Sequence, residues 1–305
     1  MTTTDKKNMV ASVKARLTNI AKEQMRPFDS VLLLYMQERL LHRLSVSEYA
    51  DNFILKGGLL MFILTQYKGR PTTDIDFLAF QIDNDIVNIK TIFQEICMVD
   101  NLDDGLLFNA DSIAVERIKE VTDYQGFRLK IICYLGSAKK SLQLDIGFGD
   151  IIVPNPKLMS FPSLLDIGTS NIQVYSIESV IAEKFHAMIV LSVVNSRMKD
   201  FYDVYSLLDI NRFDGEKLRS SIFETLKRRN TSLPNELAIF EPAFSEDIKR
   251  NTMWKAFLKK INISDLSFSK VMEELTVFLK PVYSAILNDE HFFKTWDCDK
   301  RIWKD

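Results

Sequence analysis

The start of the chain carries a hydrophobic pattern that is typical of amphipathic helices. Between residues 13 and 49 good helix formers predominate, and apolar side chains recur at spacings of three and four residues, which buries one stripe. Pro27 interrupts this pattern, because a proline inside a helix removes a backbone hydrogen bond and clashes with the preceding turn. We therefore predict two successive helices that are separated near Pro27.

The middle of the chain has the two-residue period of half-buried strands instead. Four segments combine β-branched and aromatic residues with polar ones in this pattern: residues 73–80, 112–122, 127–134 and 141–147. Three prolines between residues 154 and 162 break the pattern, and beyond Ser176 nearly every segment has helical character. The sequence therefore predicts an α+β fold, with a mixed-sheet lobe in residues 1–165 and a helical lobe in residues 166–305.

Composition restricts the class of protein. The 305-residue chain holds 39 basic and 41 acidic residues, so no overall field draws it to nucleic acid or to an anionic membrane. Its three cysteines form no CxxC pair and its three histidines are scattered, which argues against a zinc site or a disulfide framework. The start lacks the apolar segment of a secretory signal, and no stretch reaches the ~20 apolar residues of a membrane span. We expect a soluble protein of the cytoplasm.

An Asp-Ile-Asp segment is the first candidate for chemistry. In a strand over residues 73–80, Asp74 and Asp76 project from one face while Ile75 and Phe77 enter the core. Close carboxylates repel each other unless a cation lies between them, and oxygen ligands are those that Mg²⁺ prefers. The alternative is a solvated edge strand with two incidental aspartates, which this segment alone does not exclude.

Other residues extend the candidate site. Asp145 faces away from its apolar neighbours in the strand over residues 141–147, so it could join the two aspartates as a third metal ligand. Asp150 competes for that role, but its place after two glycines favours an ordinary loop aspartate. Upstream, Gly57 and Gly58 precede a short helix, and the backbone N–H groups of such a turn can bind phosphate oxygens. A plain turn is the alternative there.

The helical lobe contributes a misplaced lysine. Lys184 falls on the apolar face of the helix predicted after Ser176, whereas His186 points to the opposite side and is expected at the surface without a role. In the next helix Asp200 also lies on the apolar face, with Asp203 close by. A buried ammonium needs an anion, which is either a bound triphosphate or these aspartates. The spacing leaves both alternatives open.

Two weaker signals lie in the same lobe. Basic clusters such as Lys227-Arg228-Arg229 could lie along an RNA backbone, although most such clusters are solvated faces. Four aromatic residues could stack on bases, although aromatic residues at helical spacing usually belong to the core. These are Tyr202, Tyr205, Trp254 and Trp296.

Four motifs in a fixed order carry a resemblance. They are Leu55-Lys56-Gly57-Gly58, the segment RPTTDIDF over residues 70–77, Ala182-Glu183-Lys184, and the segment RMKDFYD over residues 197–203. In this combination the chain resembles the AbiEii/MenT family of toxin nucleotidyltransferases from about Lys14 to about residue 285. This family is similar to the DNA polymerase β-like nucleotidyltransferases. The 15 residues between Gly58 and Asp74 are a departure, because that gap is longer than is usual in the superfamily.

The resemblance implies a function and roles for individual residues. It implies transfer of a nucleoside monophosphate from an NTP, with Mg²⁺ or Mn²⁺, to an RNA acceptor such as the 3′ end of tRNA. It also implies a cognate antitoxin, in a bacterial toxin–antitoxin or phage-defence pair. Nucleotidylation of a protein hydroxyl and a non-catalytic module that binds nucleotide or antitoxin are the alternatives. The expected residues are Asp74, Asp76, Lys184 and Asp200 for catalysis, Asp74, Asp76 and, from strand geometry alone, Asp145 for the metal, and Lys56, Gly57, Gly58, Arg70, Thr73 and Lys184 for the nucleotide.

Overall fold

The chain divides into two compact units in a computed structural model that describes residues 3–65, 69–99, 103–119, 125–210 and 212–305. The first unit comprises Met1–Ile63, Thr72–Gly149 and Lys157–Val174, and the second comprises Leu64–Pro71, Asp150–Pro156 and Tyr175–Asp305. Strand β7, at the end of the first unit, lies beyond residue 165, where the sequence placed the lobe boundary.

The first unit contains, within its described residues, a seven-stranded mixed sheet in the order β3-β4-β5-β2-β1-β7-β6. The strands are β1 (Phe53–Lys56), β2 (Asp74–Ala79), β3 (Leu106–Lys119), β4 (Gln125–Leu135), β5 (Ala138–Phe148), β6 (Lys157–Phe161) and β7 (Ser170–Val174). Strand β2 pairs parallel with β5, and β1 pairs parallel with β7, while the other neighbouring pairs are antiparallel. The four predicted strands correspond to β2, β3, β4 and β5, and residues 120–122 of the second prediction lie outside the described residues.

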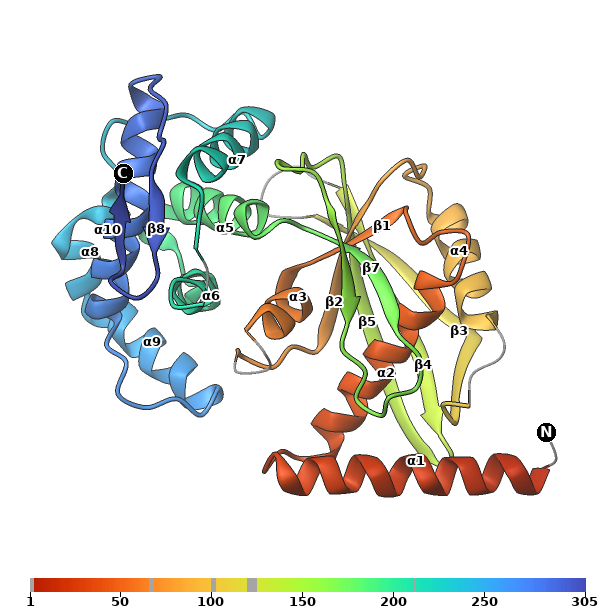
Figure 1. The fold of residues 1–305 in the computed structure, drawn as a ribbon. Coiled ribbons are helices and arrows are strands. Elements are labelled where there is room, and N and C mark those ends of the chain that lie inside the picture. Colours follow the sequence, from red (N-terminus) through yellow and green to blue (C-terminus); the bar gives the residue numbers. More distant parts are fainter. Residues whose placement is uncertain (1–2, 66–68, 100–102, 120–124, 211) are drawn as a thin grey trace. The chain divides into compact units, whose positions relative to one another are not determined.

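Helices cover this sheet. They are α1 (Thr3–Glu23), α2 (Phe28–Ser45), α3 (Gly57–Leu64) and α4 (Ile86–Met98), and the break between the first two at Pro27 confirms that prediction. Helix α1 lies across one end of the sheet, where Val10 approaches the turn between β4 and β5 (Figure 1). Helix α4 packs along β3, and its Phe93 meets Phe53 and Phe77 of the sheet, with ring centroids 5.0 Å and 6.5 Å apart. The apolar face of β2 is therefore covered, which leaves its aspartates on the opposite face.

Helix α2 is buried on more than the single stripe that its sequence pattern predicted. Arg39 and Arg43 both form ion pairs with the buried Asp104. Glu38 accepts hydrogen bonds from the Ser163 hydroxyl and the Leu164 N–H. Buried polar groups are tolerated when they are paired and hydrogen-bonded, so these partners explain why the single-stripe prediction was wrong.

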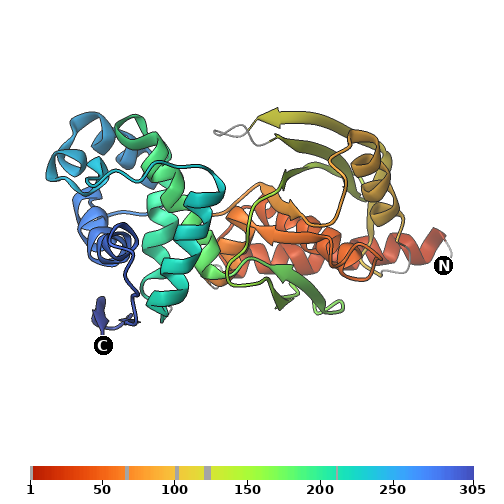
Figure 2. The same cartoon turned by 90° about the horizontal axis from the view of Figure 1, so that it is seen from above.

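The second unit is mainly helical, as predicted. It contains α5 (Ile177–Leu191), α6 (Met198–Leu207), α7 (Gly215–Arg228), α8 (Pro242–Glu246), α9 (Ile248–Lys260) and α10 (Phe268–Leu287), with short 3₁₀ helices at Ser192–Val194 and Ala238–Phe240. Helices α5 and α7 lie side by side (Figure 2). A hairpin of β8 (Thr295–Asp297) and β9 (Ile302–Lys304) is an exception to the helical pattern. Its Trp303 stacks on Phe278 of α10 at a centroid distance of 5.3 Å.

The aromatic residues of this unit serve mainly as core. Tyr202, Trp254 and Trp296 are buried, and the indole N–H groups of the two tryptophans donate to backbone carbonyls. The core alternative is therefore confirmed for these three residues. Among the described helices, none combines the length and the apolar character that crossing a membrane requires.

Candidate active site

Strand β2 presents Asp74 and Asp76 on one face. Ile75 and Phe77 alternate with them and are fully buried, whereas both aspartates are half-buried. The strand geometry is therefore the one that the alternating pattern predicted. The hydroxyl of Thr73 lies 3.2 Å from Oδ1 of Asp74 and donates to it. One oxygen of Asp74 is thus oriented by the residue before it.

The glycine turn lies directly against Asp76. Gly57 has a φ of +66°, and the N–H of Gly58, at the start of α3, donates to Oδ2 of Asp76 over 3.2 Å. A Cβ atom added to Gly57 would lie 2.0 Å from that same oxygen. Glycine is therefore required at position 57 for two reasons, the left-handed backbone and the closeness of the carboxylate. The sequence assigned the backbone N–H groups of this turn to phosphate. In the structure the N–H of Gly58 donates to Asp76.

A row of charged side chains crosses the sheet through Asp76. Lys56 on β1 lies opposite Asp76, which lies opposite Asp145 on β5, which in turn lies opposite Arg128 on β4. Directly opposed residues share one face of a sheet, so the row consists of two neighbouring carboxylates with a cation on either side. Glu116 on β3 extends the row beyond Arg128. The row places Asp145 next to the β2 aspartates, as the sequence suggested.

Arg128 was not foreseen as a site residue. Its Nε lies 2.8 Å from one Asp145 oxygen and its Nη2 lies 2.7 Å from the other, which makes a bidentate pair. The hydrogen bonds that Arg128 donates to Asp145 raise the pKa of Arg128 further above its ordinary value. The only sequence signal was the place of Arg128 on the polar side of the strand over residues 127–134, which does not identify its partner.

The donor atoms determine which cation these residues fit. Asp74 and Asp76 offer carboxylate oxygens, and Mg²⁺ is commonly held by one or two carboxylates together with substrate phosphates. Both oxygens of Asp145 are engaged by Arg128, so the predicted third ligand stands in an ion pair. Across the described part of the chain, no three His, Cys, Asp or Glu side chains are grouped so as to hold a metal ion. The residues fit a cation that shares its coordination with phosphates.

In the second unit, Lys184 lies between two buried aspartates. Its Nζ is 3.1 Å from Asp200 and 2.7 Å from Asp203, whose side chains are 1% and 2% exposed. Burial lowers the pKa of Lys184, but the carboxylates of Asp203 and Asp200 outweigh burial and raise that pKa overall. The ion-pair alternative is thus present in the structure.

Two arginines complete this ion-pair cluster. Arg70, expected to contact the nucleotide, makes two 3.0 Å hydrogen bonds to Asp203. Nε of Arg197 lies 2.6 Å from Asp200. Burial raises the pKa of Asp200, but Lys184 and Arg197 outweigh it and lower that pKa overall. The sequence left Asp203, with Asp200, open as an ion-pair partner of Lys184, and in the structure it is the residue that Lys184 and Arg70 share.

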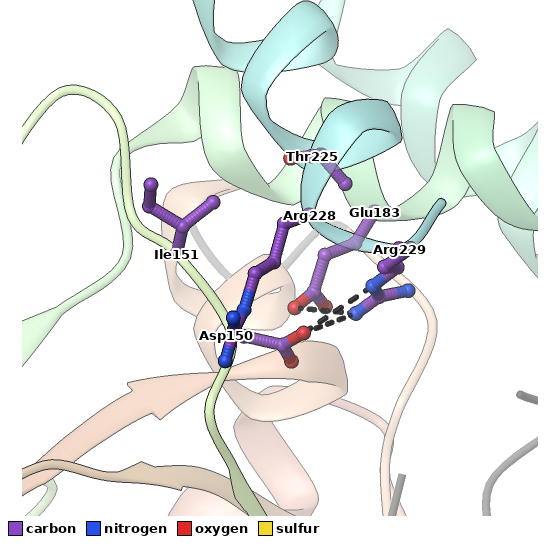
Figure 3. Close-up of a pocket in the computed structure, with 6 residues that line it drawn as sticks. All are labelled: Asp150, Ile151, Glu183, Thr225, Arg228 and Arg229. Atoms are coloured by element: carbon purple, nitrogen blue, oxygen red, sulfur yellow. Dashed lines mark hydrogen bonds and ion pairs between the residues drawn. The ribbon is translucent and has the colours of Figure 1, made fainter. Parts of the chain in front are cut away.

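A second buried cluster surrounds Arg229, after the end of α7 (Figure 3). Arg229 donates to Asp150 over 2.8 Å and to Glu183 over 3.3 Å. Its Nη1 lies 3.2 Å from Nδ1 of His186, and an arginine can only donate, so this Nδ1 accepts. The same pocket is lined by Ile151, Thr225 and Arg228. Asp150 therefore has a structural partner of its own in the second unit.

The surface position predicted for His186 was wrong. His186 is only 3% exposed, because Arg229, which follows the neighbouring helix α7, covers that side of α5. Burial, followed by the positive charge of Arg229, lowers the pKa of His186 to about 4. The imidazole is therefore neutral at physiological pH. A helical wheel of α5 alone contains no signal for this covering residue.

The family comparison agrees with the motifs. Residues 39–274 match the model of a family described as "Nucleotidyl transferase AbiEii toxin, Type IV TA system". A proposed nucleotidyltransferase from H. pylori is similar in structure, with 17% identity, a TM-score of 0.47, and coverage of 85% of this chain and 98% of the other. JHP933 from Helicobacter pylori gives 15% identity, a TM-score of 0.45, and coverage of 84% and 94%. A search among curated proteins gives no match.

Proposed function

Because this chain belongs to the AbiEii family of nucleotidyltransferase toxins, we propose that it transfers a nucleoside monophosphate from an NTP to an RNA acceptor, the 3′ end of tRNA. The family makes the chain a nucleotidyltransferase of a toxin–antitoxin system and implies an antitoxin partner. The observation that carries the proposal is the pair of β2 carboxylates on one face of the sheet. One of them, Asp76, is fixed by the N–H of Gly58.

The residues of the first unit would bind the triphosphate end of the substrate. Asp74 and Asp76 would hold Mg²⁺, which when bound offsets phosphate charge and lowers the pKa of the attacking hydroxyl. The hydroxyl oxygen then forms a bond to the α-phosphorus, the bond from that phosphorus to pyrophosphate breaks, and the hydroxyl proton passes to water. Thr73 and Gly58 each hold one carboxylate oxygen in place, so the aspartates are oriented before substrate binds.

The remaining predicted residues receive supporting roles in this proposal. Lys56 is buried opposite Asp76 and supplies a nearby positive charge. Lys184 is assigned to a phosphate of the nucleotide, as the family resemblance implies, and its two aspartates keep it charged. Asp200 and Asp203 position that ammonium, and Arg70 orients Asp203.

The test is transfer of label from α-labelled NTPs. The protein is incubated with Mg²⁺ and each NTP in turn, with total RNA in one set of reactions and total protein in another. We expect label in RNA of tRNA size, and a loss of more than about a hundredfold in Asp74→Asn and Asp76→Asn, because the metal contributes several kcal/mol. Both amides keep the side-chain shape, and thermal melts check that each variant folds. Full transfer by either variant contradicts the metal site, and label confined to protein contradicts the RNA acceptor.

A further inference from the structure

The pairing of Arg128 with Asp145 changes what the candidate metal site can offer. The two hydrogen bonds, of 2.8 Å and 2.7 Å, occupy both oxygens of the carboxylate. The fork of a guanidinium matches a carboxylate in this bidentate geometry, and such charge-assisted pairs are among the stronger hydrogen bonds. Asp145 therefore lies beside Asp76 with its negative charge balanced and its oxygens engaged.

The position of this pair makes the engagement relevant to cation binding. Asp145 is the direct cross-strand neighbour of Asp76, so a released Asp145 carboxylate would face the same space as the β2 aspartates. The pair is partly solvated, since its side chains are 34% and 21% exposed, so Asp145 is held by Arg128 and not by burial. Removing the guanidinium would thus leave Asp145 with a 3.4 Å hydrogen bond from Gln143 and make its carboxylate available as a third ligand.

We propose that Arg128 is a positioning residue that withholds Asp145 from the cation. This inference rests on the proposed function, in which Asp74 and Asp76 hold the metal. Two carboxylates alone bind a divalent cation weakly, and the phosphates of the NTP supply the missing oxygen ligands. The cation then enters the site together with the nucleotide, and the enzyme without substrate remains largely metal-free.

The test measures binding of Mn²⁺ alone, in the absence of nucleotide, from the electron paramagnetic resonance signal of the free ion. Arg128→Met should bind Mn²⁺ about tenfold more tightly than the wild type, because the cation gains a carboxylate and loses a nearby positive charge. The double variant Arg128→Met/Asp145→Asn should return to the wild-type affinity. In the wild type Arg128 balances the charge of Asp145, and in the double variant both charges are absent. These two proteins therefore offer the cation the same net charge at positions 128 and 145.

Lys130→Met is the matched control. Lys130 lies two residues from Arg128 on the same face of β4, but it opposes the uncharged Gln143. Its replacement removes a positive charge from the same strand without releasing a carboxylate, so the affinity for Mn²⁺ should change by less than about twofold. Glu116 stays in every variant, so a gain that came from Glu116 would persist in the double variant.

Several results would overturn the proposal. One is an Arg128→Met protein that folds normally, as judged by thermal melting, but binds Mn²⁺ with the wild-type affinity. Another is a gain in Mn²⁺ affinity in Lys130→Met equal to that in Arg128→Met. A double variant that binds Mn²⁺ more weakly than the wild type would show that Asp145 is already a ligand, and this comparison stands even if the single variant misfolds. If adding Asp74→Asn to Arg128→Met leaves the Mn²⁺ affinity unchanged, the metal site of the proposed function fails instead.

Discussion

The replacement of Gly57 by alanine tests whether the glycine turn at the start of α3 holds a catalytic carboxylate in place. The added Cβ would lie 2.0 Å from Oδ2 of Asp76 and 2.4 Å from its Cγ, whereas ordinary contact begins near 3.4 Å. The separation must therefore increase by more than 1 Å. Strand β2 is held by β1 and β5 on its two sides, so we expect the carboxylate to move more than the strand.

The structure gives a magnitude for both activity and stability. A displacement of about 1 Å in a catalytic group costs roughly a hundredfold in rate, so transfer by Gly57→Ala should fall by about that factor. The φ of +66° costs an alanine about 1–2 kcal/mol, and relief of the overlap adds about 1–3 kcal/mol. The total of about 2–5 kcal/mol reaches only the lower end of the 5–15 kcal/mol that is typical of folded proteins, so we expect the variant to fold, and a thermal melt checks this.

Gly136→Ala is the matched control for this prediction. Gly136, in the turn between β4 and β5, has a φ of +57°, and its added Cβ would meet only a terminal methyl of Val10 at 2.9 Å. It should lose about 1–2 kcal/mol in urea denaturation while label transfer stays at the wild-type level. A Gly57→Ala protein that transfers label within about threefold of Gly136→Ala would refute the role given to this turn.

Two further predictions concern the buried charges of the second unit. The pKa of His186 is lowered from 6.5 to about 4, so its contribution to stability is complete above pH 6.5 and is lost as the pH falls towards 4. That loss is about 3 kcal/mol. In urea melts between pH 6.5 and pH 4, the free energy of unfolding of His186→Gln should therefore fall less steeply than that of the wild type. An equal fall in the two proteins contradicts the assignment. Lys184→Met should lower the free energy of unfolding by about 3 kcal/mol, because Asp200 and Asp203 lose a shared cation. It should also abolish the nucleotide-induced rise in melting temperature, and a rise equal to that of the wild type would exclude a phosphate contact.

Properties that depend on one element could be predicted from the sequence. The two-residue period placed Asp74 and Asp76 on one face of a strand because alternation is a property of the strand itself. The same reasoning put Lys184 and Asp200 on apolar faces of successive helices, and the structure pairs them. Pro27 marked a helix break for an equally local reason, its missing N–H group.

Properties that depend on a partner from elsewhere in the chain could not be predicted. A helical wheel assigns His186 to a face, but the residue that buries it, Arg229, follows a different helix. The polar residues of α2 looked solvent-facing for the same reason, since Asp104 and Ser163 come from distant loops. Strand β6 at the edge of the sheet and β7 beside it are five residues each, which is short for a periodicity to be recognised.

The same dependence on a distant partner affects the metal-ligand role that the sequence predicted for Asp145. Alternation within its strand placed Asp145 on the polar face, and that much is correct. Whether a carboxylate can bind a cation depends also on the side chain across from it, which the strand order decides. Here β5 lies between β2 and β4, so Asp145 has a candidate metal ligand, Asp76, on one side and a guanidinium on the other. Asp145, with a guanidinium nitrogen 2.7 Å away, is the counter-ion of Arg128 in this structure. Whether Asp145 can also bind a cation must therefore be tested with Arg128 replaced.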